Sequence, residues 1–195
     1  MATSTPTHER GSSIDRLVEA DALARVRAGE ASAYALLVRE HGPMARRLAV
    51  LSGAGPDADD VVQEAFVKAY RALPRFRTGE PFRPWLLRIV VNETRNLRRG
   101  SSRRAGREER DAIDGARVVE PPGDPAEAAV AAERRSRLLA AVRRLPEPSR
   151  EVVVCRYLME LTEAETATAL DLPAGTVKSR LSRALGHLRE ELADD

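Results

Sequence analysis

The C-terminal part of the sequence places cationic and hydroxyl side chains on one face of a predicted helix, residues 174–192. The opposite face is apolar, with Val177, Leu181 and Leu188 at helical spacing. The outward residues are Lys178, Ser179, Ser182 and Arg183. Arginine and lysine donate hydrogen bonds to guanine edges, and serine contacts bases or phosphates. The pattern predicts a helix that reads duplex DNA, although a solvated face of an ordinary helical hairpin would have the same composition.

The segment before this helix predicts a second, shorter helix of the kind that accompanies a DNA-reading helix. Thr162 and Glu165 have the spacing of a capping box at the start of a short helix that ends at Leu170. Asp171 and Leu172 then form a tight turn, and Pro173 suits the start of the next helix. Two short helices joined by such a turn predict a helix-turn-helix.

A second group of chemically informative residues is a basic block in the middle of the chain. Residues 71–110 contain twelve arginines against four acidic residues, whereas residues 111–133 contain one arginine against six. Within the block, Arg88, Asn92, Arg95 and Arg99 lie at steps of four, three and four residues, so they share one polar stripe of a predicted helix. A basic block followed by an acidic stretch favours two domains with a linker between them.

The composition excludes several classes of protein. The chain has 195 residues, 43% apolar and 32% charged, and one cysteine, which excludes an internal disulfide and a cysteine-cluster zinc site. Its three histidines are scattered, and no glycine-rich phosphate loop is present. We therefore expect no catalytic site, metal or cofactor. The sequence contains neither a hydrophobic signal core nor a membrane-length apolar run, which predicts a cytoplasmic protein with no membrane insertion.

The apolar periodicity predicts an all-α protein of two small helical domains joined by a flexible linker. We expect helices over 17–37, interrupted near Gly29, and over 43–51, 57–73 and 85–99, then over 131–145, 148–159, 162–170 and 174–192. Residues 1–16 are expected to be a disordered extension, 17–99 the first domain, 100–131 a flexible acidic linker, and 132–195 the helix-turn-helix domain. The linker contains Pro-Pro and Gly-Asp-Pro and lacks helical periodicity.

The motifs of both domains resemble those of bacterial extracytoplasmic-function (ECF) sigma factors, in the sigma-70 family. The C-terminal resemblance rests on Leu145-Pro146, Leu161-Thr162 and above all the run Gly175-Thr-Val-Lys-Ser-Arg-Leu181. The N-terminal resemblance rests on Asp57-Ala-Asp-Asp60, Val62-Gln63-Glu64, Phe66, Trp85-Leu86 and Asn92. Two matched domains in the family's order, over about residues 20–100 and 132–192, are much stronger evidence for the resemblance than one matched domain would be.

The resemblance implies a sigma factor that binds core RNA polymerase, directs promoter-specific initiation and is not an enzyme. It places polymerase-binding residues on the 57–73 helix: Asp60, Gln63 and Glu64. It implies that the basic block melts the −10 element and holds its non-template strand, through Arg75, Phe76, Arg77, Phe82, Arg88, Asn92, Arg95, Arg98 and Arg99. The −35 element would be read as duplex by Lys178, Ser179, Arg180, Ser182 and Arg183. It also implies an anti-sigma factor as a partner.

Alternative interpretations stay open for some of these residues. The acidic start of the 57–73 helix also suits the helix dipole. The aromatic residues of the basic block could be core, which we expect for Trp85, whereas we expect Phe76 and Phe82 to contact DNA. The main functional alternative is a stand-alone helix-turn-helix transcriptional regulator, and an enzyme with an appended DNA-binding domain has no support in residues 1–100.

The sequence departs from the family pattern at four positions. Asn96 stands where the family often has Asp, and Glu160 and Asp171 stand where it commonly has Gly. Thr166 replaces a usual large aliphatic residue. Because Asp tolerates left-handed backbone geometry, we expect the turn at Asp171 to survive, whereas Thr166 should weaken the packing of its helix.

Overall fold

The computed structural model describes residues 8–77, 79–104 and 125–193, and every regular element in these ranges is helical. The predicted all-α fold with a C-terminal helix-turn-helix is confirmed. The central part of the predicted linker, residues 105–124, lies outside the described residues.

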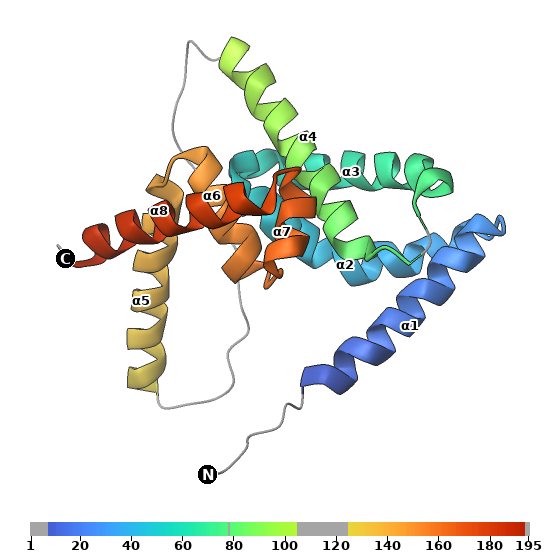
Figure 1. Cartoon of the computed structure of the whole chain (residues 1–195), viewed down its shortest axis with the longest axis horizontal. Helices are drawn as coiled ribbons and strands as arrows, with labels where there is room; N and C mark the ends of the chain where they lie inside the picture. Colours follow the sequence, from blue (N-terminus) through green and yellow to red (C-terminus); the bar gives the residue numbers. More distant parts are fainter. Residues whose placement is uncertain (1–7, 78, 105–124, 194–195) are drawn as a thin grey trace.

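The N-terminal domain is built from four long helices (Figure 1). They are α1 (His8–Arg27), α2 (Tyr34–Ala49), α3 (Ala58–Ala72) and α4 (Phe82–Arg104), with short helical turns at Ala31–Ala33, Gly55–Asp57 and Leu73–Arg75 and a π-helical segment, η2 (Val50–Ala54). Helices α2, α3 and α4 pack pairwise, and α1 packs on α2. The break between α2 and α3 falls at Gly53, whose φ of 98° is a left-handed conformation that glycine adopts easily.

The C-terminal domain contains α5 (Pro125–Arg144), α6 (Glu147–Val153), a π-helical segment η5 (Val154–Leu158), α7 (Glu163–Leu170) and α8 (Ala174–Ala193). Helix α8 packs on α5, α6 and α7. Its inward residues Val177, Ala184 and Leu188 are buried, as the apolar stripe predicts.

Several element bounds differ from the sequence-based expectation. Helix α1 begins at His8, inside the segment expected to be disordered, and α4 and α5 extend by a few residues into the expected linker. Polar residues can continue a helix without leaving an apolar period, so the pattern does not mark these ends. Pro43 does not begin a separate helix but lies inside α2.

One hydrophobic cluster runs through both domains. In the N-terminal domain its most buried members include Phe82, Leu86 and Val90 of α4, and in the C-terminal domain Leu161 and Leu170. The domains meet where α4 packs against α7 and where η2 approaches α6 (Figure 1). Helix α4 is therefore both a core element of its own domain and a contact surface for the other.

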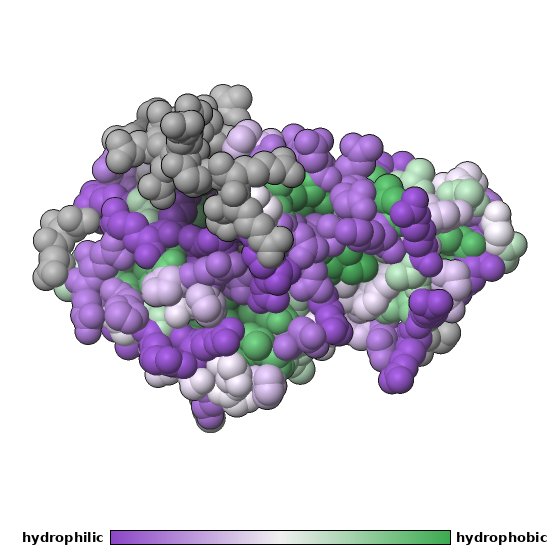
Figure 2. Space-filling model, turned by 90° about the horizontal axis from the view of Figure 1, so that it is seen from above, coloured by the Kyte–Doolittle hydropathy of each residue, from purple (hydrophilic) through white to green (hydrophobic). Residues whose placement is uncertain are grey.

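The face shown in Figure 2 is mostly polar, with apolar areas scattered between charged side chains. Exposed large apolar residues among the described positions include Val67 and Tyr70 on α3, Leu138 on α5 and Leu192 on α8. No helix in the described part is long and apolar enough to cross a membrane.

Candidate nucleic-acid interface

The helix-turn-helix is fixed by local hydrogen bonds that the sequence predicts. The Thr162 hydroxyl accepts a bond from the Glu165 backbone N–H at 3.2 Å, and the Glu165 carboxylate accepts one from the Thr162 N–H at 2.8 Å. This is the predicted capping box at the start of α7. Helix α7 ends at Leu170, and the φ of 57° at its C-cap residue Asp171 is left-handed, so the turn survives with Asp in place of Gly. Glu160, the other position where the family commonly has Gly, also has a positive φ, 53°.

Helix α8 presents the predicted basic and hydroxyl face to solvent. Lys178, Ser179, Ser182 and Arg183 are exposed, and Arg180 is half-buried. The Ser179 hydroxyl donates to the Thr176 carbonyl at 3.1 Å, and the Arg183 Nε donates to the Ser179 carbonyl at 3.3 Å. These weak local bonds hold the Ser179 and Arg183 side chains against the surface of α8. From there both side chains can reach a DNA groove without any unfolding of the domain.

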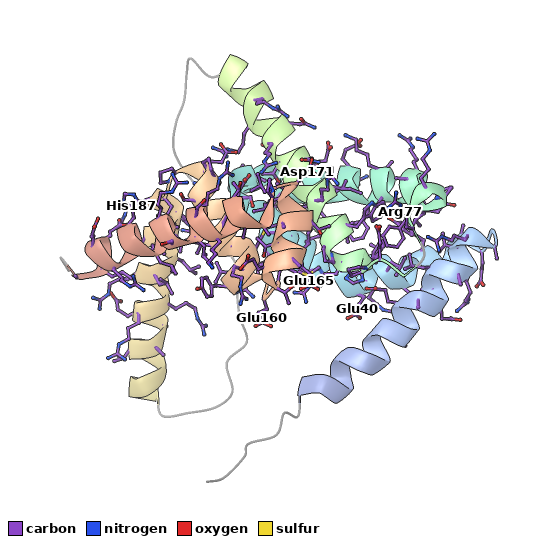
Figure 3. All side chains as sticks on the ribbon, in the orientation of Figure 1. Glu40, Arg77, Glu160, Glu165, Asp171 and His187 are labelled. Atoms are coloured by element: carbon purple, nitrogen blue, oxygen red, sulfur yellow. The ribbon has the colours of Figure 1, made fainter. Side chains whose placement is uncertain are left out.

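Part of the polar stripe of α4 contacts the C-terminal domain, and only the rest of it faces solvent. Arg88 forms an ion pair with Asp171 at 2.8 Å, and Arg98 one with Glu147 at 2.6 Å. Figure 3 shows Asp171 at the end of α7, beside α4. Farther along α4, Asn92 and Arg99 are exposed, and Arg99 donates to the Asn96 side-chain oxygen at 2.6 Å. The structure therefore places four of the predicted −10 arginines on α4, namely Arg88, Arg95, Arg98 and Arg99, and pairs the first three with the C-terminal domain.

The Arg95–Glu151 pair is the most buried of these contacts. Two guanidinium nitrogens of Arg95 donate to the two carboxylate oxygens of Glu151, at 2.9 and 2.6 Å. The Glu151 side chain is only 3% exposed and that of Arg95 is 27% exposed. The hydrogen bond to Glu151 raises the pKa of Arg95 above its ordinary value, against the opposing effect of burial. Sequence reasoning missed Glu151, because α6 reads as an apolar helix and no local pattern shows which helix it faces.

Two predicted DNA-contacting aromatics are buried in this structure. Phe82 is 0% and Phe76 6% exposed, and their rings meet edge to face at 5.8 Å between centroids. Both pack against the half-buried Trp85 ring, at 4.7 Å from Phe76 and 5.5 Å from Phe82. Trp85 packs against the core, as expected. In this conformation both phenylalanine rings are buried. Contact of either ring with DNA would therefore require the loop before α4 to rearrange.

The arginines of the loop before α4 face solvent. Arg75 and Arg77 are exposed, and Arg77 lies 3.8 Å from Glu80 (Figure 3). Arg83, which sequence reasoning did not select, donates to the Met159 carbonyl of the other domain at 2.5 Å. Its place in the first turn of α4 gives no sequence signal for this contact.

Helix α3 exposes the three residues predicted to bind a partner: Asp60, Gln63 and Glu64. The Glu64 carboxylate lies 3.5 Å from the Lys68 ammonium group, which also contacts Glu93 at 2.5 Å. Tyr70 is 44% exposed, because the buried stripe of α3 follows Val61, Ala65 and Ala69. Tyr70 and the exposed Val67 extend the polar face with an apolar patch of the kind that protein partners cover.

Neither the cysteine nor the possible metal ligands form a reactive site among the residues that the structure describes. Cys155 is buried, and burial raises the pKa of its thiol to about 12, which suppresses the nucleophilic thiolate. Within the described residues, no group of three or more His, Cys, Asp and Glu side chains could hold a metal ion. What the arrangement offers is binding: a basic helix-turn-helix, an arginine-rich helix and a mixed polar and apolar helix face.

Comparison with known families assigns both domains. The model of Sigma-70 region 2 matches residues 37–104, and that of Sigma-70 region 4 matches residues 135–188. This chain belongs to the ECF group of the sigma-70 family. It is 34% identical over 175 residues to the ECF RNA polymerase sigma-E factor of Escherichia coli K12. The alignment covers 87% of this chain and 92% of that protein. It is also 34% identical, over 86% of its length and 91% of the relative's, to RNA polymerase sigma factor NccH of Alcaligenes xylosoxydans xylosoxydans.

Two solved structures share the fold of this chain. CnrH, solved in complex with the cytosolic domain of CnrY, aligns with a TM-score of 0.66 and 30% identity, over 91% of this chain and 99% of CnrH. The sigma factor RpoE of Bartonella quintana, solved with the anti-sigma factor NepR, aligns with a TM-score of 0.67 over 83% of this chain and 98% of RpoE. At 22% identity, the second likeness concerns the fold alone.

Proposed function

We propose that this ECF protein binds core RNA polymerase as a sigma factor and directs it to a subset of promoters. The observation that carries the proposal is the presence of region 2 and region 4 in one chain, each with an exposed polar helix of fitting chemistry. A stand-alone helix-turn-helix regulator would need only the second domain, so the region 2 match disfavours that alternative. The proposed role needs no catalytic residue in this chain, since the polymerase performs the chemistry.

The proposed polymerase contact is the exposed face of α3. Asp60, Gln63 and Glu64 offer carboxylate and amide groups to a basic partner surface, and Val67 and Tyr70 add apolar area beside them. Complementary charges speed and orient association, while buried apolar area stabilises the complex. A solvated helix start would explain the acidic residues but not the exposed apolar ones.

The proposed −35 contact is the N-terminal half of α8. In helix-turn-helix proteins the N-terminal residues of the second helix contact base edges in the major groove. The proposed contacts are those of the exposed face, together with the half-buried Arg180: Lys178, Ser179, Arg180, Ser182 and Arg183.

The proposed −10 contact is the arginine-rich surface of α4 and the loop before it. Its exposed members are Arg75, Arg77, Asn92 and Arg99, and Arg88, Arg95 and Arg98 become available where the C-terminal domain leaves α4. Single-strand capture requires cations along the backbone and a surface for unstacked bases. Phe76 and Phe82 stay candidates for that surface, on the condition that the loop rearranges.

We place the protein in the cytoplasm, with an anti-sigma factor as a further proposed partner. CnrH, its structural relative at 30% identity, was solved with the cytosolic domain of another protein, CnrY. An anti-sigma factor would need to cover the α3 face or the DNA-binding surfaces in order to inhibit this chain.

Co-elution with core RNA polymerase, followed by capture of fragments from a promoter library, tests the proposal. We expect a stable complex that retains a subset of promoter fragments, whereas core polymerase alone retains none of them selectively. Selective capture of DNA by the chain alone, with no complex with polymerase, would support the regulator alternative instead.

A further inference from the structure

The loop before α4 is contacted by the last residue of α1. A guanidinium nitrogen of Arg27 donates a hydrogen bond to the carbonyl oxygen of Phe76, 49 positions farther along the chain. The same guanidinium group lies over the Phe76 ring, 5.6 Å from the ring centroid, where a cation is attracted to an aromatic face. Figure 1 shows the end of α1 beside this loop. Arg27 therefore holds both the backbone and the ring of Phe76.

The contact with Arg27 falls where the chain leaves regular structure. Phe76 follows a short helical turn, and its backbone is extended, with φ −69° and ψ 125°. The Phe76 N–H donates to the Leu73 carbonyl at 3.1 Å, and the Glu80 N–H donates to the Arg77 carbonyl at 3.3 Å. Neither of these bonds uses the Phe76 carbonyl, so Arg27 adds a constraint that the turns of the loop do not supply themselves.

Helix α1 is itself fixed in place, so it can serve as an anchor for the loop. Ala22 and Leu23 of α1 are buried in the hydrophobic cluster. Glu19 Oε2 lies 3.0 Å from Nε2 of the buried His41 on α2. The His41 ring in turn packs against the Phe82 ring, with 5.3 Å between centroids. Helix α1 therefore reaches the packed aromatic rings at two places, here and at its last residue.

We infer that Arg27 is a positioning residue for recognition of the −10 element. It holds the backbone of the loop before α4 in one place and thereby sets which −10 sequences are preferred, without touching the DNA itself. The inference rests on the proposed function of this loop in strand capture. Because the hydrogen bond is to the Phe76 carbonyl, the ring can turn toward an unstacked base while the backbone stays in place. A loop held in one conformation presents one set of contacts, and it discriminates between bases better than a loop that samples several conformations.

The inference can be tested with the full-length chain in complex with core polymerase. The variant Arg27→Met keeps much of the apolar length of the side chain and removes its hydrogen-bond donors. The matched control, Arg25→Met, removes the same charge from α1, where the partners of Arg25 are Glu30 at 2.8 Å and Asp21 at 3.6 Å. The probe is a promoter that the wild-type complex selects, with its −10 element randomised and its −35 element unchanged. Captured fragments are sequenced and compared with the starting pool.

The expected result is a loss of −10 discrimination with other functions kept. The preference for the best −10 sequence over its single-base variants should fall about tenfold in Arg27→Met, the effect of one lost hydrogen bond to a charged group. Arg27→Lys keeps a charged donor and should retain most of the preference, and Arg25→Met should retain all of it. The affinity for core polymerase and the salt dependence of promoter capture should be unchanged, because no phosphate contact is lost.

Three results would overturn the inference. A direct phosphate contact by Arg27 would weaken all promoters alike in Arg27→Met and reduce the salt slope by about 1. An unchanged −10 preference in the folded Arg27→Met complex would show that the contact sets nothing. An equal loss in Arg25→Met would show that the stability of α1 explains the effect. Circular dichroism checks folding, and Arg27→Gln, judged by the same criteria, replaces Arg27→Met if that variant does not fold.

Failure of the inference and failure of the proposed function give different results for the wild type. In all three results above the wild-type complex keeps its −10 preference, so the proposed −10 role of the loop stands. A wild-type complex that captures fragments regardless of their −10 sequence would refute that role and the inference together.

Discussion

Arg95 of α4 and Glu151 of α6 join the two domains through a paired hydrogen bond, with nitrogen–oxygen distances of 2.9 and 2.6 Å. The residues lie 56 positions apart in the sequence, on either side of the basic-to-acidic change in composition. A residue selected for DNA binding thus has a protein partner in the same chain. The Arg95–Glu151 contact therefore contributes to how the two domains pack against each other.

The Arg95–Glu151 contact should appear as a coupling energy between the two side chains. In a double-mutant cycle of Arg95→Ala and Glu151→Ala, we expect each single variant to lower the free energy of unfolding and the interaction to amount to about 1–3 kcal/mol. Removal of Arg95 leaves the buried Glu151 carboxylate without its two guanidinium hydrogen-bond donors. Urea denaturation followed by circular dichroism measures the effect, and strict additivity of the two variants would show that the pair contributes nothing.

The α3 face should be required for polymerase binding but not for folding. Reversal of two exposed charges, in Asp60→Arg with Glu64→Arg, should weaken co-purification with core polymerase by at least tenfold, because like charges then meet the basic partner surface. Circular dichroism should be unchanged. The control, Glu40→Arg with Glu190→Arg, reverses two exposed charges on α2 and α8. Normal core binding by the folded α3 variant would contradict the assignment.

The N-terminal half of α8 should determine −35 recognition. Replacement of a side chain that contacts a base, as in Arg183→Ala, should cost about 1–3 kcal/mol of promoter binding, and Lys178→Ala should act in the same direction. Arg189→Ala is the matched control, because it removes an exposed cation near the C-terminal end of the same helix. Promoter binding by the polymerase complex is the readout. An equal loss in all three variants would indicate nonspecific electrostatics.

The α4 arginines should act in strand opening. The triple variant Arg95→Ala, Arg98→Ala, Arg99→Ala should reduce permanganate reactivity of −10 thymines in the polymerase complex and flatten its salt dependence. A promoter with a pre-melted −10 bubble should recover part of the lost activity, since it bypasses the opening step. Normal opening at every salt concentration would show that these arginines have no role in strand opening.

Thr166 is a site where the chain can be stabilised. Its side chain is 0% exposed, and its hydroxyl has no hydrogen-bond partner. Thr166→Val should raise the free energy of unfolding by about 1 kcal/mol, because the buried polar group costs more than the methyl that replaces it. Thr168 is the control: it is exposed, and its hydroxyl donates to the Ala164 carbonyl at 3.1 Å, so Thr168→Val should bring no gain. A stabilisation of equal size in both variants would rule out this explanation.

Local chemistry predicts much of the fold and little of its long-range arrangement. The capping box of Thr162, the left-handed turn at Asp171 and the buried stripe of α8 all follow from side chains a few residues apart. The pairing of Arg95 with Glu151 depends on how two domains dock, and no periodicity of either helix records it. Phe76 and Phe82 show the same limit, because aromatic residues beside arginines suit a DNA-binding loop and a packed loop equally well.

Run-off transcription with purified core polymerase and a promoter library tests the central claim most directly. The account predicts specific transcripts that appear only when this chain is added, and that are lost with Asp60→Arg, Glu64→Arg and with Arg183→Ala. Transcripts that do not depend on the chain, or sequence-specific binding of DNA by the chain without any transcription, would contradict it.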